Sequence, residues 1–247
     1  MTRPLIAGNW KMFGLAASLD EIGRLAAGLE ARAPAARVAI CPPATLLARA
    51  AERAAGTLVE IGGQDCRAET SGAFTGDVSP EQLVDAGARL VILGHSERRT
   101  LHGETDAVVR AKVQGARRAG LEPIVCVGEL LEQRRTGRAV EIVRAQLRRS
   151  LPPELAGTSF FIAYEPVWAI GSGLTPTVDE IADMHAAIRA DLADLFGPAG
   201  AETPILYGGS VKPENAAAVL ATPGVGGALV GGASLKAVDF LKIIEAV

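Results

Sequence analysis

The sequence predicts a single (β/α)8 barrel of the α/β class, in which eight parallel strands form a barrel inside a ring of helices, spanning residues 1–247. Short aliphatic and β-branched runs alternate eight times with amphipathic stretches, and the runs lack the strict alternation of a half-exposed strand. Eight such units in 247 residues favour a closed barrel over an open doubly wound sheet, which usually has fewer strands. No Pro/Gly/Ser-rich linker divides the chain.

The predicted strands are short and follow one another at regular intervals. In order, they are residues 5–10, 37–42, 58–64, 89–94, 122–129, 159–165, 204–209 and 227–232. Helical segments lie between them, among them residues 18–32, 79–87 and 177–196. These three segments begin with Ser18, Ser79 and Thr177, each followed by acidic residues in the first turn, a pattern that predicts helix N-caps.

The composition excludes several classes of function. A net charge of −3 and a pI near 5.7 argue against the basic face that binds nucleic acid. Cys41, Cys66 and Cys126 are scattered and show no disulfide framework or metal-binding spacing, which favours a reducing compartment. The first residues lack the apolar core of a signal peptide, and no run approaches the roughly 18 apolar residues of a membrane span. We expect a cytoplasmic protein with no metal and no nucleic-acid or membrane partner.

Polar side chains follow several of the predicted strands at the point where each strand ends. They are Asn9 and Lys11 after the first strand, His95 and Glu97 after the fourth, and Glu165 at the end of the sixth. In α/β barrels the active site lies at the carboxyl ends of the strands. These side chains are therefore expected to meet at one mouth of the barrel.

Glu165 and His95 can be interpreted as an acid–base pair. Glu165 precedes Pro166, which favours an extended backbone at the rim, and a partly desolvated carboxylate there would be a stronger base than one in water. His95 precedes a polar segment that could begin a helix, whose N-terminus favours a neutral ring able to donate a hydrogen bond to a carbonyl. Considered alone, Glu165 could equally be a solvated or capping carboxylate. A single histidine is more often structural, and we interpret His102 and His185 as structural residues.

Lys11 and two glycine pairs point to an anionic ligand. Lys11 could neutralise a phosphate or an enolate, or form a Schiff base, although a lone lysine usually lies on the surface. Gly208/Gly209 and Gly231/Gly232 follow the seventh and eighth strands, and each pair is followed by Ser and then Lys. Backbone N–H groups in these two loops are the usual phosphate site of a barrel, so the pairs predict phosphate binding.

The loop of residues 65–79 is longer than most connections in a barrel. It carries Phe74 and Thr75, which we expect to be exposed, and an exposed apolar side chain on a long loop favours a subunit contact. We therefore predict that Gln64, Phe74 and Thr75 contact a second copy of the chain. Thr75 is expected to reach the partner's active site.

Seven short motifs, taken together, resemble those of one family. In chain order they are "GNWKM", "GAFTG", "LGHSERR", "CVGE", "AYEPVWAIGSG", "YGGSV" and "LVGGASL". Their order along nearly the whole chain resembles the triosephosphate isomerase family. The resemblance implies a TIM-barrel homodimer that interconverts dihydroxyacetone phosphate and D-glyceraldehyde 3-phosphate through an enediolate, in glycolysis and gluconeogenesis. It also implies that no metal or organic cofactor is needed.

The resemblance assigns a role to each residue of the mouth. Glu165 would move a proton between two carbons, His95 would polarise the carbonyl, and Lys11 would favour the negative charge of phosphate and enediolate. Asn9 would contact the substrate and Glu97 would support Lys11. Backbone N–H groups for the phosphate would come from Gly171, Ser210, Gly231 and Gly232, while Ser96 and Cys126 would brace the site.

The resemblance also implies a lid with two stiff ends and a softer centre. Its residues are Pro166, Val167, Trp168, Ala169, Ile170, Gly171, Ser172, Gly173, Leu174, Thr175, Pro176 and Thr177. The lid reads "IGSGLTPT" where many members have "GTGKTAT", and Phe13 replaces a commoner asparagine. Neither departure touches a proposed catalytic group, so they bear on kinetics and not on the class of reaction.

Two other functions fit parts of the pattern. A phosphate-binding barrel aldolase would use Lys11 as a Schiff-base nucleophile, which borohydride would trap with a carbonyl substrate. A non-catalytic metabolite binder could keep the fold without the chemistry, because barrels host many functions. Such a binder would catalyse no exchange of solvent deuterium into dihydroxyacetone phosphate.

Overall fold

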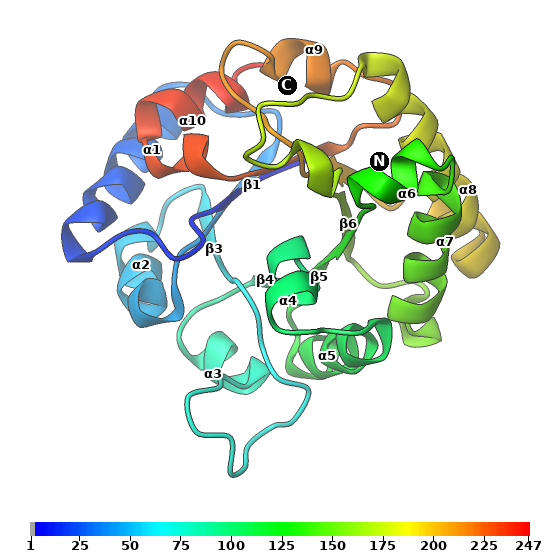
Figure 1. The fold of residues 1–247 in the computed structure, drawn as a ribbon. Coiled ribbons are helices and arrows are strands. Elements are labelled where there is room, and N and C mark those ends of the chain that lie inside the picture. The colour runs from blue at the N-terminus through cyan, green and yellow to red at the C-terminus, as the bar shows by residue number, and fades with distance from the viewer. Residues whose placement is uncertain (1–2) are drawn as a thin grey trace.

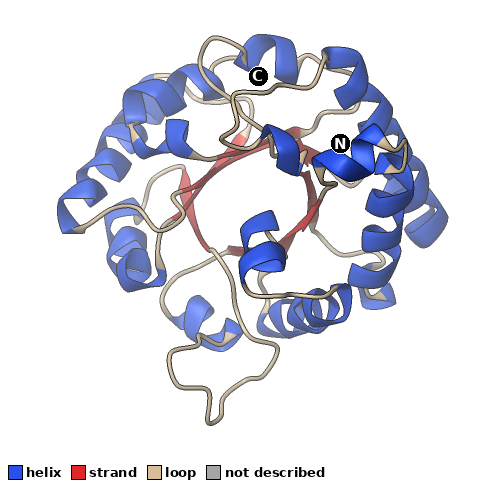
Figure 2. Ribbon diagram, in the orientation of Figure 1, coloured by secondary structure: helices blue, strands red, loops and turns tan. Residues whose placement is uncertain are grey.

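The predicted barrel is confirmed by a computed structural model, which describes residues 3–247. Eight parallel strands pair in chain order, and β1 pairs with β8 to close the ring (Figure 2). They are β1 (Leu5–Asn9), β2 (Arg37–Cys41), β3 (Val59–Gly63), β4 (Leu90–Leu93), β5 (Glu122–Val127), β6 (Phe161–Tyr164), β7 (Ile205–Tyr207) and β8 (Gly227–Val230). All eight were predicted, and each ends one or two residues earlier than expected. Residues 1 and 2 of the predicted domain lie outside the described residues.

Helices surround the ring of strands (Figure 1). The α-helices are α1 (Asp20–Ala31), α2 (Leu47–Ala54), α3 (Pro80–Asp85), α4 (Ser96–Leu101), α5 (Asp106–Ala119), α6 (Leu131–Arg135), α7 (Ala139–Ser150), α8 (Val178–Ala201), α9 (Ala216–Leu220) and α10 (Ala237–Ile244). Short 3-10 helices are η1 (Ala16–Leu19), η2 (Ala44–Leu46), η3 (Pro153–Leu155), η4 (Val167–Ala169) and η5 (Gly232–Leu235). Among these helices, none in residues 3–247 combines the length and apolarity that a membrane span requires.

Two of the three predicted N-caps are present. The side chains of Ser79 and Thr177 each accept the backbone N–H of the residue three positions on, which is Gln82 or Glu180. The side chain of that residue accepts the backbone N–H of Ser79 or Thr177 in turn. The prediction for Ser18 was wrong: it lies inside η1, and its Oγ accepts the Leu15 N–H. Because this short 3-10 turn comes first, α1 begins only at Asp20.

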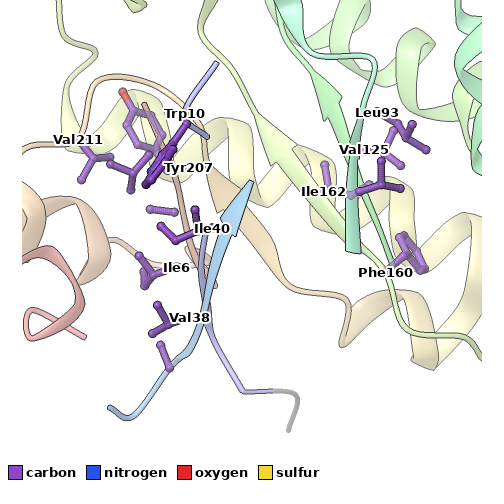
Figure 3. Close-up of a cluster of buried hydrophobic side chains, with 14 of the residues drawn as sticks. Ile6, Trp10, Val38, Ile40, Leu93, Val125, Phe160, Ile162, Tyr207 and Val211 are labelled. Atoms are coloured by element: carbon purple, nitrogen blue, oxygen red, sulfur yellow. The ribbon is translucent and has the colours of Figure 1, made fainter. Parts of the chain in front are cut away.

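The barrel has two separate apolar layers because alternate residues of each strand point inwards and outwards. The inner layer fills the barrel and consists of Leu5, Ala7, Ala39, Cys41, Leu90, Ile92, Ile124, Cys126, Phe161, Ala163, Leu206 and Leu229. The outer layer packs the strands against the helices, and Figure 3 shows part of it, including Ile6, Val38, Ile40, Val125 and Ile162. Burial on both faces explains why the strand sequences do not alternate.

An ion cluster closes the amino ends of the strands. Arg37, at the start of β2, donates to Glu60 of β3 at 2.7 Å and to Glu122 of β5 at 2.5 Å. Its guanidinium carbon lies 5.5 Å from the ring centroid of Phe161, which belongs to the inner layer. Glu60 and then Glu122 hold the pKa of Arg37 above its ordinary value. The inner layer is thereby shielded from water at this end.

The loop between β3 and α3 extends away from the barrel, as Figure 1 shows. Phe74 is 36% exposed and Thr75 is exposed, as the sequence predicted. The loop is held by its own contacts: Arg67 lies over the Phe74 ring at 3.9 Å and pairs with Glu69 and Asp77, both at 2.9 Å. Whether a second subunit covers it stays a prediction.

His185 is a fully buried histidine of α8, in keeping with the structural interpretation. Its Nδ1 lies 3.2 Å from the Gly224 carbonyl oxygen, so Nδ1 carries the ring proton. Nε2 has no hydrogen-bond partner in residues 3–247. Burial lowers the pKa of His185 from 6.5 to about 4, because a second ring proton would have no acceptor there.

We expect His185 to make the fold less stable in acid. The unfolded chain protonates this residue below pH 6.5 and the folded protein only near pH 4, so its contribution is complete above pH 6.5 and is lost as the pH falls towards 4. The full difference corresponds to about 3 kcal/mol. Urea unfolding of intact protein and His185→Asn across this pH range measures it, with exposed His102→Asn as control. A stability gap between intact protein and His185→Asn that does not change with pH would contradict this expectation.

Candidate active site

A pocket of about 510 Å³ opens at the carboxyl ends of the strands. The predicted residues that line it are Asn9, Lys11, His95, Glu165, Ile170, Gly171, Gly208, Gly209, Ser210, Gly231 and Gly232. Other lining residues include Lys212, Glu214 and Asp239. Glu97 faces a second groove of about 550 Å³, which Asn9, Lys11 and His95 also line. The structure thus brings together residues that are more than 200 positions apart in the sequence.

Glu165 is held at the floor of the pocket and is only 1% exposed. Its Oε2 accepts the Ser96 N–H at 2.8 Å, and its own N–H donates to the Val127 carbonyl oxygen at 2.8 Å. A side chain at Gly128 is impossible in this arrangement, because an added Cβ would lie 1.7 Å from the Glu165 carbonyl oxygen. Gly128 therefore lets β5 and β6 approach closely enough to fix the Glu165 backbone.

The pKa of Glu165 does not show the expected increase in basicity. Burial opposes ionisation, but the His95 ring, the Ser96 N–H and Lys11 outweigh it, so the pKa of Glu165 is lowered. The sequence indicates the desolvation of this carboxylate, but the groups that offset it come from other strands.

His95 is the N-cap of α4, as the polar segment after it predicted. Its Nδ1 accepts the Glu97 N–H at 3.2 Å, which places the proton of the neutral ring on Nε2. Nε2 lies 2.9 Å from Glu165 Oε1, yet that oxygen has no aligned donor in residues 3–247. Burial opposes protonation of His95, but the Glu165 carboxylate outweighs it and raises the pKa. An N–H and a carboxylate oxygen thus face the same pocket, 2.9 Å from each other.

Lys11 is presented by an unusual backbone conformation. Its φ of 51° is left-handed, which a residue with a side chain rarely adopts, and it is held there by its neighbours. The Lys11 N–H donates to Asn9 Oδ1 at 2.9 Å, and the Gln64 amide donates to the Lys11 and Cys41 carbonyl oxygens, both at 2.8 Å. Lys11 Nζ lies 2.5 Å from Glu97 Oε1. Gln64, predicted as a subunit contact, therefore also positions Lys11 within its own chain.

The predicted lid runs from Pro166, the N-cap of η4, to Thr177. Its half-buried Trp168 donates from Nε1 to Glu129 Oε1 at 2.8 Å, which anchors the first end. At the tip, Gly171 and Gly173 have left-handed φ values of 68° and 82°. Ser172 Oγ donates to the Trp168 carbonyl oxygen at 2.6 Å and accepts the Leu174 N–H at 3.2 Å. The tip is therefore a closed turn, more ordered than the soft centre that the glycines suggest.

Two residues near the site were missed by the sequence analysis. Glu129 is fully buried and accepts hydrogen bonds from Tyr164 and Trp168, and Arg134 donates to it at 3.2 Å. Glu129 stands in the quoted motif "CVGE", but a buried carboxylate looks like any other in sequence. Arg134 lies in an arginine-rich stretch that is typical of a solvated helix.

Cys126 lies beneath the site and is fully buried. Burial and then the charge of Glu165 raise its pKa, so it stays a thiol beside the carboxylate. In residues 3–247, no cluster of three or more His, Cys, Asp or Glu side chains is arranged to hold a metal ion.

Comparisons with known proteins agree with this geometry. The family model described as "Triosephosphate isomerase" matches residues 4–247. Curated triosephosphate isomerases from Caulobacter vibrioides and Xanthobacter flavus are 63% and 58% identical, and each alignment covers 99% of this chain and 96% or 98% of the relative. The crystal structure of triosephosphate isomerase from Bartonella henselae has a TM-score of 0.91 and 48% identity, covering 99% of this chain and 98% of that one. The chain therefore belongs to the triosephosphate isomerase family.

Proposed function

We propose that this protein is a one-domain isomerase that interconverts dihydroxyacetone phosphate and D-glyceraldehyde 3-phosphate. The observation that carries the proposal is the pair of Glu165 Oε1 and His95 Nε2, 2.9 Å apart and facing one pocket with Lys11. A carboxylate base and an N–H donor so placed can act on a carbon and on its adjacent oxygen. A coupled assay on the purified protein tests the proposal. A correctly folded sample that shows no isomerase activity would refute it.

In the proposed reaction the substrate gives up two protons to the side chains and receives two protons from them. Glu165 removes a proton from the hydroxymethyl carbon, the C–H electrons form a carbon–carbon double bond, and the carbonyl oxygen takes the Nε2 proton of His95. The enediol then returns its other hydroxyl proton to His95, while Glu165 delivers its proton to the former carbonyl carbon. The product is the aldehyde, and both side chains recover their starting states.

The hydrogen bond of Glu165 to Ser96 suggests how its basicity is controlled. Its carboxylate accepts the Ser96 N–H, which contributes to the lowered pKa. To reach a substrate carbon, Glu165 must give up this hydrogen bond and keep its burial. Its pKa would then be lowered less, because burial remains and only His95 and Lys11 still oppose it.

Lys11 is proposed to stabilise the negative charge of the phosphate and of the enediolate. A salt bridge of 2.5 Å joins its Nζ to Glu97, whereas a Schiff-base nucleophile needs an amine that is free of such a contact. This contact argues against the aldolase alternative. A Cβ built on Gly231 would lie 3.8 Å from Lys11 Cε, so the Gly231–Gly232 turn and the lysine can share one phosphate. Ser210 and Gly171 border the same space.

We also propose that two copies of the chain form a homodimer. Several apolar side chains that line the second groove are exposed, with Met12, Leu101 and Phe13 at 94%, 76% and 58%. A solvated cluster of this kind is typical of an interface. The partner's loop of residues 65–79 is proposed to enter this groove, with Thr75 near Asn9 and Lys11.

We expect Thr75→Arg to weaken the dimer and to lower activity per chain by about tenfold or more at assay dilution, because a bulky charge in an interface is poorly accommodated. Sedimentation and the coupled assay at matched concentrations measure both effects. Thr136→Arg, at an exposed threonine after α6, is the control. The dimer proposal fails if the intact protein is a fully active monomer.

We also propose that the reaction needs no cofactor and takes place in the cytoplasm. Glu165 and His95 supply all the proton transfers, and the three cysteines are free and buried, which suits a reducing compartment. Activity that survives exhaustive treatment with a metal chelator is the expected result.

A further inference from the structure

Arg134 of α6 contacts both ends of the lid. Its Nη1 donates to Glu129 Oε1 at 3.2 Å, and its Nη2 lies 2.7 Å from Glu180 Oε1. Its guanidinium carbon also lies 5.1 Å from the ring centroid of Trp168. Trp168 belongs to the beginning of the lid and is hydrogen-bonded to Glu129, and Glu180 lies just beyond the end of the lid.

At the first end, Arg134 compensates the charge of Glu129, the carboxylate to which Trp168 is hydrogen-bonded. Glu129 is completely buried, and its Oε1 accepts the Trp168 Nε1–H at 2.8 Å and the Tyr164 hydroxyl at 3.1 Å. No other cation contacts Glu129 in residues 3–247. A buried carboxylate without a cation would be costly, so Arg134 stabilises this anchor in its place.

At the second end, Arg134 contacts Glu180, whose side chain completes the N-terminal cap of α8. Glu180 Oε2 accepts the Thr177 N–H at 2.8 Å, and Thr177 Oγ1 accepts the Glu180 N–H at 3.2 Å. Thr177 is the last residue of the lid. Arg134 and then the Thr177 N–H lower the pKa of Glu180, so the cap is held as a carboxylate by the same guanidinium.

We propose that Arg134 is a positioning residue that fixes the separation of the two lid ends, so that residues 169–176 between them move as one body. A planar guanidinium can direct separate N–H groups at two carboxylates and still stack on an indole, which a lysine ammonium cannot do. Loss of Arg134 lets each end move by itself, and the lid then closes incompletely over the enediolate. This step rests on the proposed function, because it assumes that the lid covers a reacting substrate.

The first experiment needs no activity. Amide hydrogen exchange of residues 168–177 is compared among intact protein, Arg134→Gln and Arg135→Gln, a neighbouring exposed arginine that loses the same charge. We expect Arg134→Gln to speed exchange at both lid ends by about tenfold, since the local opening loses a charge-assisted contact. Arg135→Gln should match the intact protein. Unchanged exchange in Arg134→Gln would overturn the proposal.

The second experiment measures phosphate released per isomerisation. We expect Arg134→Gln to raise this ratio roughly five- to tenfold, with kcat reduced more than KM changes. Glu180→Gln, which keeps an amide oxygen for the Thr177 N–H, should raise it similarly, and the double variant should add little. Additive effects would overturn the idea of one clamp. An intact protein that exchanges as expected but does not isomerise would refute the proposed function and leave the clamp standing.

Discussion

Glu165→Asp should lower kcat by about 10²- to 10⁴-fold, the usual contribution of a single general base, while KM changes little. Aspartate keeps the charge but withdraws the carboxylate by one methylene. Glu165 is 1% exposed and its backbone is fixed by the Val127 carbonyl and by the close approach of Gly128, so the shorter side chain cannot recover the lost reach. Substrate binding is proposed to depend on Lys11 and the glycine loops, which this change does not touch.

The measurement for Glu165→Asp is a pair of progress curves, one in each direction, with solvent deuterium incorporation followed in parallel. Glu154→Asp, at an exposed glutamate, is the matched control for the same chemical change. Loss of deuterium incorporation in step with isomerisation would locate the defect in proton transfer. A near-normal kcat would remove Glu165 from the mechanism.

Excision of Ile170 to Gly173 should leave the barrel folded, reduce kcat/KM by about 10²-fold, and divert product towards methylglyoxal and inorganic phosphate. The excised turn holds Gly171, whose N–H is proposed to reach the phosphate when the lid closes. Ser172 Oγ contacts both the Trp168 carbonyl oxygen and the Leu174 N–H, so these backbone groups already lie close together and a shortened loop can join them. The remaining anchors, Trp168 to Glu129 and the Thr177 cap, are untouched.

The enediolate explains why the products should change. It carries a phosphate on the neighbouring carbon, and water-exposed intermediate can expel that phosphate by elimination. Closure would hold the phosphate out of the eliminating alignment and keep water away. Phosphate release per isomerisation, compared with intact protein, is the quantity to measure, and circular dichroism checks the fold. A shortened loop that isomerises slowly but releases no extra phosphate would show that the lid only positions substrate.

The sequence was sufficient for the barrel because its signal is repeated eight times and each strand is buried on both faces. It was also sufficient for the mouth, since strand ends meet at one edge and Asn9, Lys11, His95 and Glu165 stand at such ends. Contacts between loops could not be predicted. Glu129 contacts Trp168 and Arg134 contacts Glu180, and each of these partners lies more than 30 positions away in the sequence. No local pattern therefore marks Glu129 or Arg134.

Local propensity also misled in two places. Ser18 has the residue type and the following acids of an N-cap, but a 3-10 turn forms first and its hydroxyl binds Leu15. The pKa of Glu165 depends on His95, Ser96 and Lys11 together, so its direction follows from a balance that only the assembled site defines.

The ion cluster at the amino ends of the strands has a consequence for how this protein tolerates mutation. Arg37, Glu60 and Glu122 lie at the opposite end of the barrel from Glu165 and His95. Substitutions around Arg37 should reduce the amount of folded protein in a cell, and each surviving molecule should turn over at its normal rate. Substitutions at the mouth of the barrel should lower the turnover rate of each molecule and leave the amount of folded protein unchanged. In a mutational library scored separately for abundance and for specific activity, the variants that lower abundance should lie at one end of the barrel and those that lower specific activity at the other. Laboratory selection could then raise one of these two properties without lowering the other.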